Sequence, residues 1–316
     1  MPGKPTEVDG KRPVLGLRAG RWTVLAALAA SAVGAAVAIA VVSIGDERPP
    51  NVLLITLDTA RKDHLSCYGY ARPTTPNIDA VAGESLVYHA AVAASNWTLP
   101  SHASMLTGLF PPTHGAHFVG RDQPHVPHTE PAARMASQCK TLAEVLQEAD
   151  YRTVAVVAQF WWLGAHYELD QGFDYYDHRA GAPPLHYRRA DQITDLAIEW
   201  LEQDDGRPFF LFLNYMDPHH PYVPPPPFDR RFQTASSIQS MPPSWEYFDQ
   251  LQVQLLQQRR PWPAETTEFL VNAYDGEIAY MDQHVGRLFD WLRSNDYYDS
   301  TMIVITSDHG EQFGEH

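Results

Sequence analysis

The sequence predicts an α/β fold built on a parallel sheet, and two features of its hydrophobic pattern support this class. First, four short apolar runs rich in β-branched and aromatic residues have the length of buried strands. They lie at 51–57, 153–158, 209–215 and 301–307. Second, apolar residues between these runs recur at every third and fourth position, as in helices. Continuous apolar strands that alternate with helices are typical of a mostly parallel sheet covered by helices on both faces.

The intervals between the strands differ in character. Helical spacing is clearest in three segments, at 141–149, 193–203 and 265–292. Residues 217–263 are instead rich in Pro, Gln and aromatic side chains. We therefore expect a long loop excursion there, with a short helix near 245–258.

Composition and charge limit the classes of function. The chain has 316 residues, of which 44% are hydrophobic and 19% charged, enough to bury one large core or two smaller ones. The formal net charge is −15, which argues against nucleic acid as a partner. The two cysteines, Cys67 and Cys139, are too few for a disulfide scaffold and lack a CxxC spacing for zinc, although a single bridge between them stays open.

An uncharged, apolar segment near the N-terminus predicts a membrane helix. It runs from Trp22 to Gly45 and as a helix would extend about 36 Å, enough to cross a bilayer. Five basic residues precede it and two acidic residues follow it, which places the N-terminus in the cytoplasm and the remainder outside. A cleaved signal peptide is the alternative. The predicted parts are a basic cytoplasmic tail at 1–21, a transmembrane signal-anchor at 22–45, a linker at 46–50 and an extracytoplasmic (periplasmic) catalytic domain at 51–316.

Polar residues follow three of the four predicted strands. Asp58 comes after the first strand, the segment 217–220 (DPHH) after the third, and Asp308 with His309 after the fourth. Ligands of open parallel sheets bind beyond the carboxyl ends of the strands. A single Asp in this position is most often a cap or turn residue. Three such groups at one edge instead predict a binding or catalytic site.

The segment TLPSHASMLTG (98–108) predicts a helix that begins at Thr98, has Pro100 in its first turn and stops at Gly108. In isolation, Thr98 is explained as a helix cap. Backbone N–H groups at a helix N-terminus also stabilise negative charge, both on a Thr98 alkoxide and on an anionic ester placed against it. A bound metal would supply most of the activation of such a nucleophile.

Taken together, several motifs resemble the sulfatase family of the alkaline phosphatase superfamily. The main ones are NVLLITLDTARKDHLSCYGY (51–70), TLPSHASMLTG (98–108) and SDHGEQFGEH (307–316), with further similarity at 171–177, 220–222 and 274–288. Their number and order make the resemblance specific, and it covers nearly everything from residue 51 to the end. It implies an alkaline phosphatase-like fold in which a divalent metal lies beside a nucleophile that attacks a sulfate or phosphate ester. Because the chain ends at His316, inside the last motif, we expect it to be truncated at its C-terminus.

The resemblance also implies roles for single residues. Asp58, Asp308 and His309 match the metal ligands, and Thr98 matches the nucleophile, which also contacts the metal. One divalent ion is expected. Carboxylate ligands suit Ca²⁺ or Mg²⁺, and the imidazole leaves Mn²⁺ or Zn²⁺ open.

Two further histidines are candidates for catalytic roles. The resemblance makes His219 the candidate acid or substrate ligand after the third strand, with His220 as the alternative; capping of the proline-rich loop explains both equally well. A histidine near pH 7 can donate a proton to a leaving alkoxide. His102 is a candidate contact for the ester anion, if it is not simply packed inside its helix.

The chain departs from the sulfatase pattern in ways that alter the expected chemistry. Thr98 replaces the Cys or Ser that sulfatases oxidise, so no formylglycine is expected. His102 stands at the Arg position, Thr59 replaces a second Asp, and 158–164 (AQFWWLG) lacks a Lys and a His. These changes favour phosphoryl chemistry, as in the phosphoglycerol and phosphoethanolamine transferases.

Three functions therefore remain open. The first is a membrane-anchored hydrolase that cleaves a sulfate or phosphate ester of a small molecule or head-group through a Thr98 intermediate. The second is a phosphodiesterase or phosphotransferase, and the third is a non-catalytic, membrane-tethered remnant.

Overall fold

The computed structural model describes residues 49–120, 131–182, 185–234, 247, 250, 251, 253, 254 and 261–315. Five strands form one sheet in the order β3-β2-β4-β1-β5, and every pairing is parallel. The strands are β1 (Asn51–Leu57), β2 (Arg152–Val157), β3 (Tyr175–Asp177), β4 (Phe209–Tyr215) and β5 (Thr301–Thr306). The predicted parallel sheet is confirmed. The sequence did not predict β3, because its three residues, YYD, form no apolar run.

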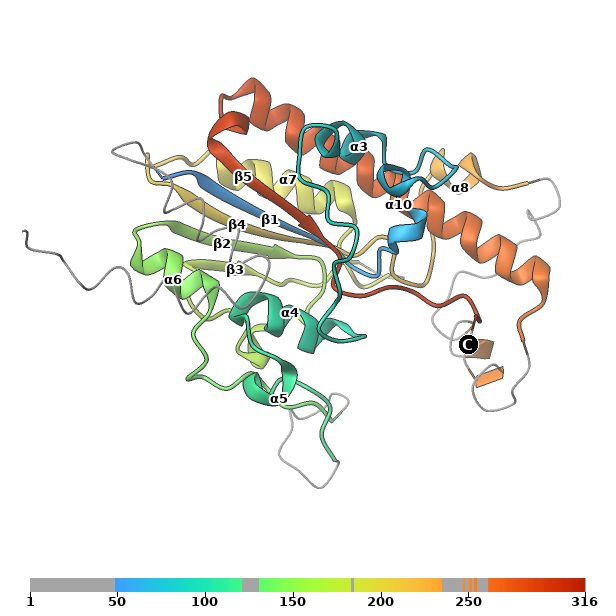
Figure 1. Cartoon of the computed structure of the whole chain (residues 1–316), viewed down its shortest axis with the longest axis horizontal. Helices are drawn as coiled ribbons and strands as arrows, with labels where there is room; N and C mark the ends of the chain where they lie inside the picture. Colours follow the sequence, from blue (N-terminus) through green and yellow to red (C-terminus); the bar gives the residue numbers. More distant parts are fainter. Residues whose placement is uncertain are drawn as a thin grey trace, which may run out of the picture.

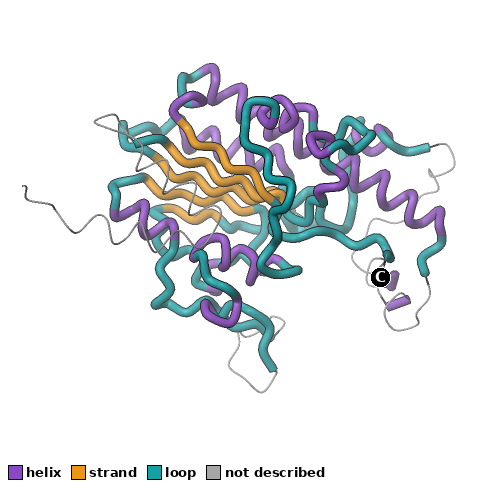
Figure 2. The backbone as a smooth tube through the Cα atoms, viewed as in Figure 1, coloured by secondary structure: helices purple, strands orange, loops and turns teal. Residues whose placement is uncertain are grey.

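Helices cover both faces of this sheet (Figures 1 and 2). The α-helices are α3 (Pro76–Ala82), α4 (Thr98–Thr107), α5 (Pro111–His114), α6 (Leu142–Glu148), α7 (Ala190–Leu201), α8 (Phe228–Arg231) and α10 (Ala264–Ser294). Short 3₁₀ turns lie at Lys62–His64, Ser66–Tyr68, Ala165–Tyr167 and Tyr298–Ser300. Four of the five helices predicted from the sequence correspond to α4, α6, α7 and α10, with ends shifted by a few residues. Of the fifth, near 245–258, the structure describes residues 247, 250, 251, 253 and 254, and these are helical.

The two-residue repeat of the strands divides the core into two clusters. In β1, Leu53, Ile55 and Leu57 pack on the side of α3, α7 and α10, whereas Val52 and Leu54 pack on the side of α4 and α6. Figure 1 shows these two helical layers on opposite sides of the sheet. By the same alternation, the polar residues Thr56, in β1, and Asp58, directly after it, face α4.

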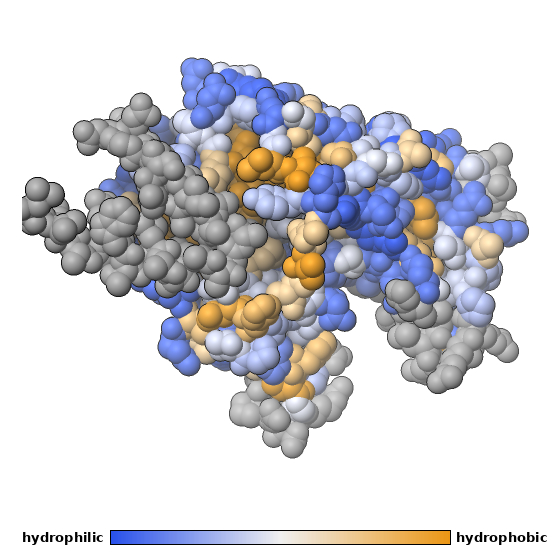
Figure 3. All heavy atoms as spheres, viewed as in Figure 1, coloured by the Kyte–Doolittle hydropathy of each residue, from blue (hydrophilic) through white to orange (hydrophobic). Residues whose placement is uncertain are grey.

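The strand β5 forms one edge of the sheet among the described residues. All six of its residues are half-buried, whereas those of β4 are all buried. Figure 3 shows apolar side chains over β5 on an otherwise mostly hydrophilic face. An edge strand is packed on one side only, which accounts for the difference.

Several predictions fall on segments that the structure describes only in part. The tail at 1–21, the membrane helix at 22–45 and most of the linker at 46–50 lie outside the described residues. Within the described part of the chain, no helix is long and apolar enough to cross a bilayer. Both cysteines are free thiols.

Candidate active site

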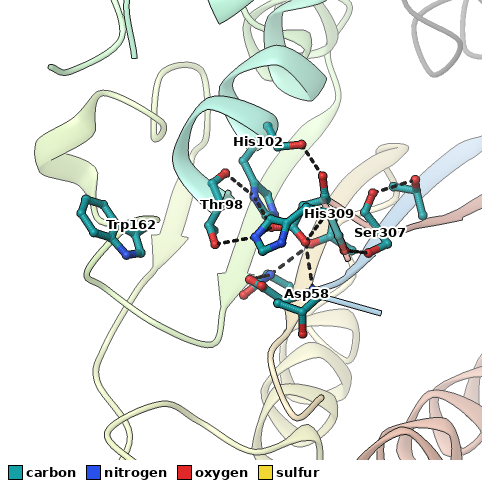
Figure 4. A network of polar contacts seen from close by, with 12 residues as sticks. Asp58, Thr98, His102, Trp162, Ser307 and His309 are labelled. Atoms are coloured by element: carbon teal, nitrogen blue, oxygen red, sulfur yellow. Dashed lines mark hydrogen bonds and ion pairs between the residues drawn. The ribbon is translucent and has the colours of Figure 1, made fainter. Parts of the chain in front are cut away.

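The three predicted metal ligands converge at the carboxyl ends of β1 and β5 (Figure 4). Asp58, Asp308 and His309 each offer one ligand atom, and these atoms all lie within 4.8 Å of one another. The strands bring them together because β1 pairs in register with β5, Thr56 opposite Thr306. Both carboxylates are fully buried.

The donor set fits a single divalent cation. Asp58 Oδ1 and Asp308 Oδ2 are buried without a hydrogen-bond partner, an arrangement that is costly unless a cation balances the charge. Burial, followed by the charge of Asp308, raises the pKa of Asp58 to about 7, and burial also raises the pKa of Asp308. A cation bound between the two carboxylates would favour their ionised forms instead.

The imidazole of His309 has the orientation that a metal ligand needs. Its Nδ1 lies 2.9 Å from the carbonyl oxygen of Gly310 and donates to it, so the lone pair of Nε2 faces the cluster. This Nε2 is 3.3 Å from Asp308 Oδ2. Burial opposes a charge on the ring, but the carboxylates of Asp308 and Asp58 outweigh it and raise the pKa of His309.

Thr98 presents its hydroxyl to this cluster. It is the first residue of α4, and its Oγ1 lies 3.4 Å from His309 Nε2. Figure 4 shows the two side chains facing one another above Asp58. The hydroxyl therefore combines two features of an activated nucleophile, namely a helix N-terminus and a neighbouring group of metal ligands.

His102 contacts Thr98 from within α4, and its Nδ1 lies 3.6 Å from Asp308 Oδ2. It is fully buried one turn after Thr98. Its Nδ1 lies 2.9 Å from the carbonyl oxygen of Thr98, and its Nε2 lies 3.1 Å from Thr56 Oγ1. Burial lowers the pKa of His102 to about 4, so the ring is neutral near pH 7. The structure thus places His102 against Thr98 and Thr56, and its contact with an ester anion stays a prediction.

Asn214, which no sequence motif indicated, links the two sides of the site. Its Nδ2 lies 3.2 Å from Thr56 Oγ1 and 3.3 Å from Asp58 Oδ2, while its Oδ1 accepts from the Ala158 N–H at 3.3 Å. The amide thereby orients the Asp58 carboxylate. An amide inside the apolar run FFLFLNY (209–215) was a signal that could have found it.

The histidines after β4 lie on the same edge, and their predicted roles stay predictions. Burial, then the charge of His220, lowers the pKa of His219 to about 3, and its Nδ1 donates to the carbonyl oxygen of His220 at 2.7 Å. A neutral His219 has no proton on Nε2 to give. His220 Nδ1 lies 3.4 Å from Glu311 Oε2. Burial opposes ionisation of Glu311, yet the hydrogen bond from His220 holds the pKa of Glu311 at about 2.

This arrangement defines a class of protein: an α/β domain with a candidate site for a divalent metal at the carboxyl end of a parallel sheet. The chain belongs to the sulfatase family, since the family model described as Sulfatase matches residues 50–316.

Individual relatives agree with this assignment. The chain is 27% identical to the multifunctional alkaline phosphatase superfamily protein PehA of Trinickia caryophylli, over 84% of this chain and 64% of that protein. It is 28% identical to human N-sulphoglucosamine sulphohydrolase, over 84% of this chain and 51% of that protein. The chain thus spans between half and two thirds of the length of these relatives.

A solved structure confirms the fold. The phosphonate monoester hydrolase of Agrobacterium radiobacter superposes with a TM-score of 0.63 at 22% identity, covering 84% of this chain and 64% of that chain.

Proposed function

We propose that this chain carries a metal-dependent hydrolase site for phosphoric or sulfuric esters, with Thr98 as the nucleophile and a preference for phosphoryl esters. One observation carries the proposal: the Thr98 hydroxyl lies 3.4 Å from His309 Nε2, beside two buried carboxylates with unpartnered oxygens. A threonine that served only to cap a helix would not need a histidine and two buried carboxylates beside its hydroxyl.

The reaction divides into two displacements. A divalent cation, when bound, supplies Lewis acidity that lowers the pKa of the Thr98 hydroxyl, whose proton goes to solvent. Thr98 Oγ1 then forms a bond to phosphorus while the bond to the leaving alcohol breaks, and the leaving oxygen takes a proton from His220. In the second displacement, water replaces Thr98 on phosphorus and the hydroxyl regains its proton.

Two features favour phosphorus over sulfur at this site. Threonine cannot be oxidised to the aldehyde on which formylglycine sulfatases depend, whereas a threonine alkoxide can attack phosphorus without prior modification. The relatives named above also include PehA, described as multifunctional, and a phosphonate monoester hydrolase. Sulfate esters remain within the proposed class, because the family match is to sulfatases.

The test is to trap the covalent intermediate. The Mn²⁺-loaded full chain is mixed with bis-p-nitrophenyl phosphate, denatured in acid and examined by peptide mass spectrometry. We expect a phosphoryl adduct on Thr98, retained in Thr98→Ser and absent from Thr98→Ala. Cleavage of p-nitrophenyl sulfate without cleavage of the phosphodiester would refute the phosphoryl preference. Turnover by Thr98→Ala at the wild-type rate would refute the nucleophile.

We also propose that residues 22–45 anchor this domain to a membrane, with the site on the extracytoplasmic side. The uncharged run and the preceding basic residues support it. Alkaline carbonate extraction of membranes that contain the full chain is expected to leave the protein in the pellet. N-terminal sequencing distinguishes the anchor from a cleaved signal peptide, since a new N-terminus near residue 40 would exclude the anchor.

A further inference from the structure

A series of hydrogen bonds joins the candidate metal ligand Asp58 to the backbone of Thr98, and the hydroxyl of Thr56 lies at its centre. Thr56 Oγ1 is 3.1 Å from His102 Nε2 on one side and 3.2 Å from Asn214 Nδ2 on the other. The same Asn214 nitrogen lies 3.3 Å from Asp58 Oδ2, and His102 Nδ1 lies 2.9 Å from the carbonyl oxygen of Thr98. These five residues are here called the Thr56 connection.

The three side chains in the middle of the Thr56 connection are completely buried. Thr56 in β1 and Asn214 in β4 lie directly opposite each other in the sheet, and His102 packs onto them from α4. Burying a polar group is costly unless it is hydrogen-bonded, and a buried network is stable only when all of its members have partners. Formation of the two strands alone would not require polar side chains at these positions.

The groups around His102 fix the direction of its two hydrogen bonds. Its Nδ1 faces two acceptors, the carbonyl oxygen of Thr98 at 2.9 Å and Asp308 Oδ2 at 3.6 Å. Nδ1 therefore carries the ring proton, and Nε2 of the neutral ring accepts a hydrogen bond. The donor is the Thr56 hydroxyl at 3.1 Å.

Asn214 and Thr56 are matched in the same way. Asn214 Oδ1 accepts the backbone N–H of Ala158 at 3.3 Å, so the two protons of Nδ2 are directed at Thr56 Oγ1 and Asp58 Oδ2. The carbonyl oxygen of Leu213 is another acceptor for the Thr56 hydroxyl, but it is farther away, at 3.4 Å. Each group of the Thr56 connection thus meets a partner of the opposite kind.

Helix α4 is attached to both strands that lead into the buried carboxylates. Ser101 Oγ donates to the carbonyl oxygen of Asp308 at 2.6 Å, which holds the first turn of α4 to the segment after β5. The contact between His102 and Thr56 holds the same turn to β1. Figure 4 shows His102 beside Thr98, on the helix that carries both. Two attachments to different strands fix the place of Thr98 Oγ1 relative to the cluster.

We propose that Thr56 is a positioning residue whose hydroxyl couples the placement of the Asp58 carboxylate to the placement of the Thr98 nucleophile. The inference rests on the proposed function for the role of Thr98. A reacting atom must lie within about 3–3.5 Å of its target, and a misplacement of about 1 Å can lower the rate about 100-fold. A hydroxyl that holds both sides therefore acts on metal binding and on nucleophilic attack together.

Thr56→Val tests the proposal, because it removes the hydroxyl and nearly keeps the shape of the side chain. Two quantities are measured on the full chain: Mn²⁺ affinity by calorimetric titration, and the rate of phospho-Thr98 formation from bis-p-nitrophenyl phosphate at saturating Mn²⁺. We expect the affinity to fall about tenfold, since Thr56 acts on Asp58 through Asn214. The rate of adduct formation should fall about 100-fold. Thr56→Ser keeps the hydroxyl and should retain most of both.

Thr153→Val is the matched control. Thr153 is also a buried threonine in a strand, and its hydroxyl bonds to the carbonyl oxygen of Gly172 at 2.7 Å and to the N–H of Asp174 at 2.9 Å. It lies opposite Phe210, near the start of β4 and thus at the other end of the sheet. This variant loses buried hydrogen bonds as Thr56→Val does, but it should leave both measured quantities unchanged.

A double variant covers the case in which Thr56→Val does not fold. Thr56→Val with His102→Leu removes both partners of one bond, so neither is left unpaired at that contact. The same losses of Mn²⁺ affinity and adduct rate are expected from it.

Several results would overturn the inference. These are wild-type values of both quantities in Thr56→Val, a fall in Mn²⁺ affinity without a fall in adduct rate, equal losses in Thr153→Val, and losses in Thr56→Ser as large as those in Thr56→Val. If the wild type forms no adduct, the proposed function fails, whereas the Mn²⁺ affinities of the same variants still decide whether Thr56 acts on Asp58.

Discussion

Two pairs of buried carboxylates lie at the same edge of the sheet, one on each face. Asp58 and Asp308 face α4, whereas Asp217 and Glu277 lie between β4, α7 and α10. All four are fully buried. Burial raises the pKa of every one, and for Glu277 the charge of Asp217 adds to it. Burial and a raised pKa therefore do not by themselves distinguish a catalytic pair from a structural one.

The two pairs differ in the groups that contact their carboxylates. Asp217 Oδ1 accepts the Ala190 N–H at the start of α7, at 3.0 Å, and Glu277 Oε1 accepts the Val223 N–H at 2.7 Å. Arg189 Nη1 lies 3.9 Å from Glu277 Oε2. Backbone N–H groups donate to both pairs, since those of Thr59 and His309 bond to Asp308 Oδ1, and each pair has one buried oxygen per carboxylate without a hydrogen-bond partner. The second pair has a guanidinium beside it, whereas the first pair lies beside His309 and, among the described residues, belongs to the one group whose three ligand atoms are close enough to hold an ion.

Removing one carboxylate from each pair should separate their roles most strongly. Asp308→Ala is expected to weaken Mn²⁺ or Zn²⁺ binding by more than about 100-fold, because loss of a direct ligand exceeds the 10–100-fold cost of losing its support. Calorimetric titration of the full chain measures this effect. Asp217→Asn is the matched control and should leave metal affinity unchanged. Equal losses of metal affinity in the two variants would show that the two pairs of carboxylates do not differ in metal binding.

Removing the Asn214 amide, which orients Asp58, should lower metal affinity less than removing Asp308. Asn214→Leu removes the donor to Asp58 Oδ2 and should weaken metal binding about 10–100-fold. Thr194→Val is the control, since the buried Thr194 hydroxyl bonds to Tyr215 OH and the carbonyl of His284. Both variants lose buried hydrogen bonds, so a comparable fall in metal affinity in each would point to general destabilisation.

The pair on the other face should control stability as a function of pH. Because the pKa of Asp217 is raised from 3.8 to about 7 and that of Glu277 is also raised, the folded state binds more protons than the unfolded state. The free energy of unfolding then falls as pH rises through about 4 to 7. The Gln side chain of Glu277→Gln cannot ionise, so the variant should lose less stability between pH 5 and pH 8 than the wild type. The difference in Tm between the two pH values should be smaller by about 2–4 °C for each kcal/mol of stability recovered.

Differential scanning calorimetry at pH 5 and pH 8 measures this last effect. Saturating Mn²⁺ keeps Asp58 and Asp308 ionised, so that they do not add a pH dependence of the same sign. If Tm depends on pH in the same way in Glu277→Gln and in the wild type, Glu277 is already ionised in the folded protein and Arg189 stabilises its charge.

The sequence by itself determined the elements that have strong local signals. The apolar runs of β1, β4 and β5 and the 3.6-residue period of α10 identify themselves over short distances, because burial on two faces or on one stripe dictates residue type. The cluster of Asp58, Asp308 and His309 could be predicted because each directly follows such a strand or lies within three residues of its end. Their motifs also belong to a family whose members share this spacing.

Only the tertiary structure decided which polar side chains work together. The strand order places Asn214 of β4 opposite Thr56 of β1, and packing of α4 on that face places the buried His102 against Thr56. Ring contacts likewise join Trp97, Phe118 and Trp162. These contacts link segments far apart in the chain, and no local pattern encodes them. Their free energy comes from burial and hydrogen bonding that exist only after the sheet and its helices have assembled.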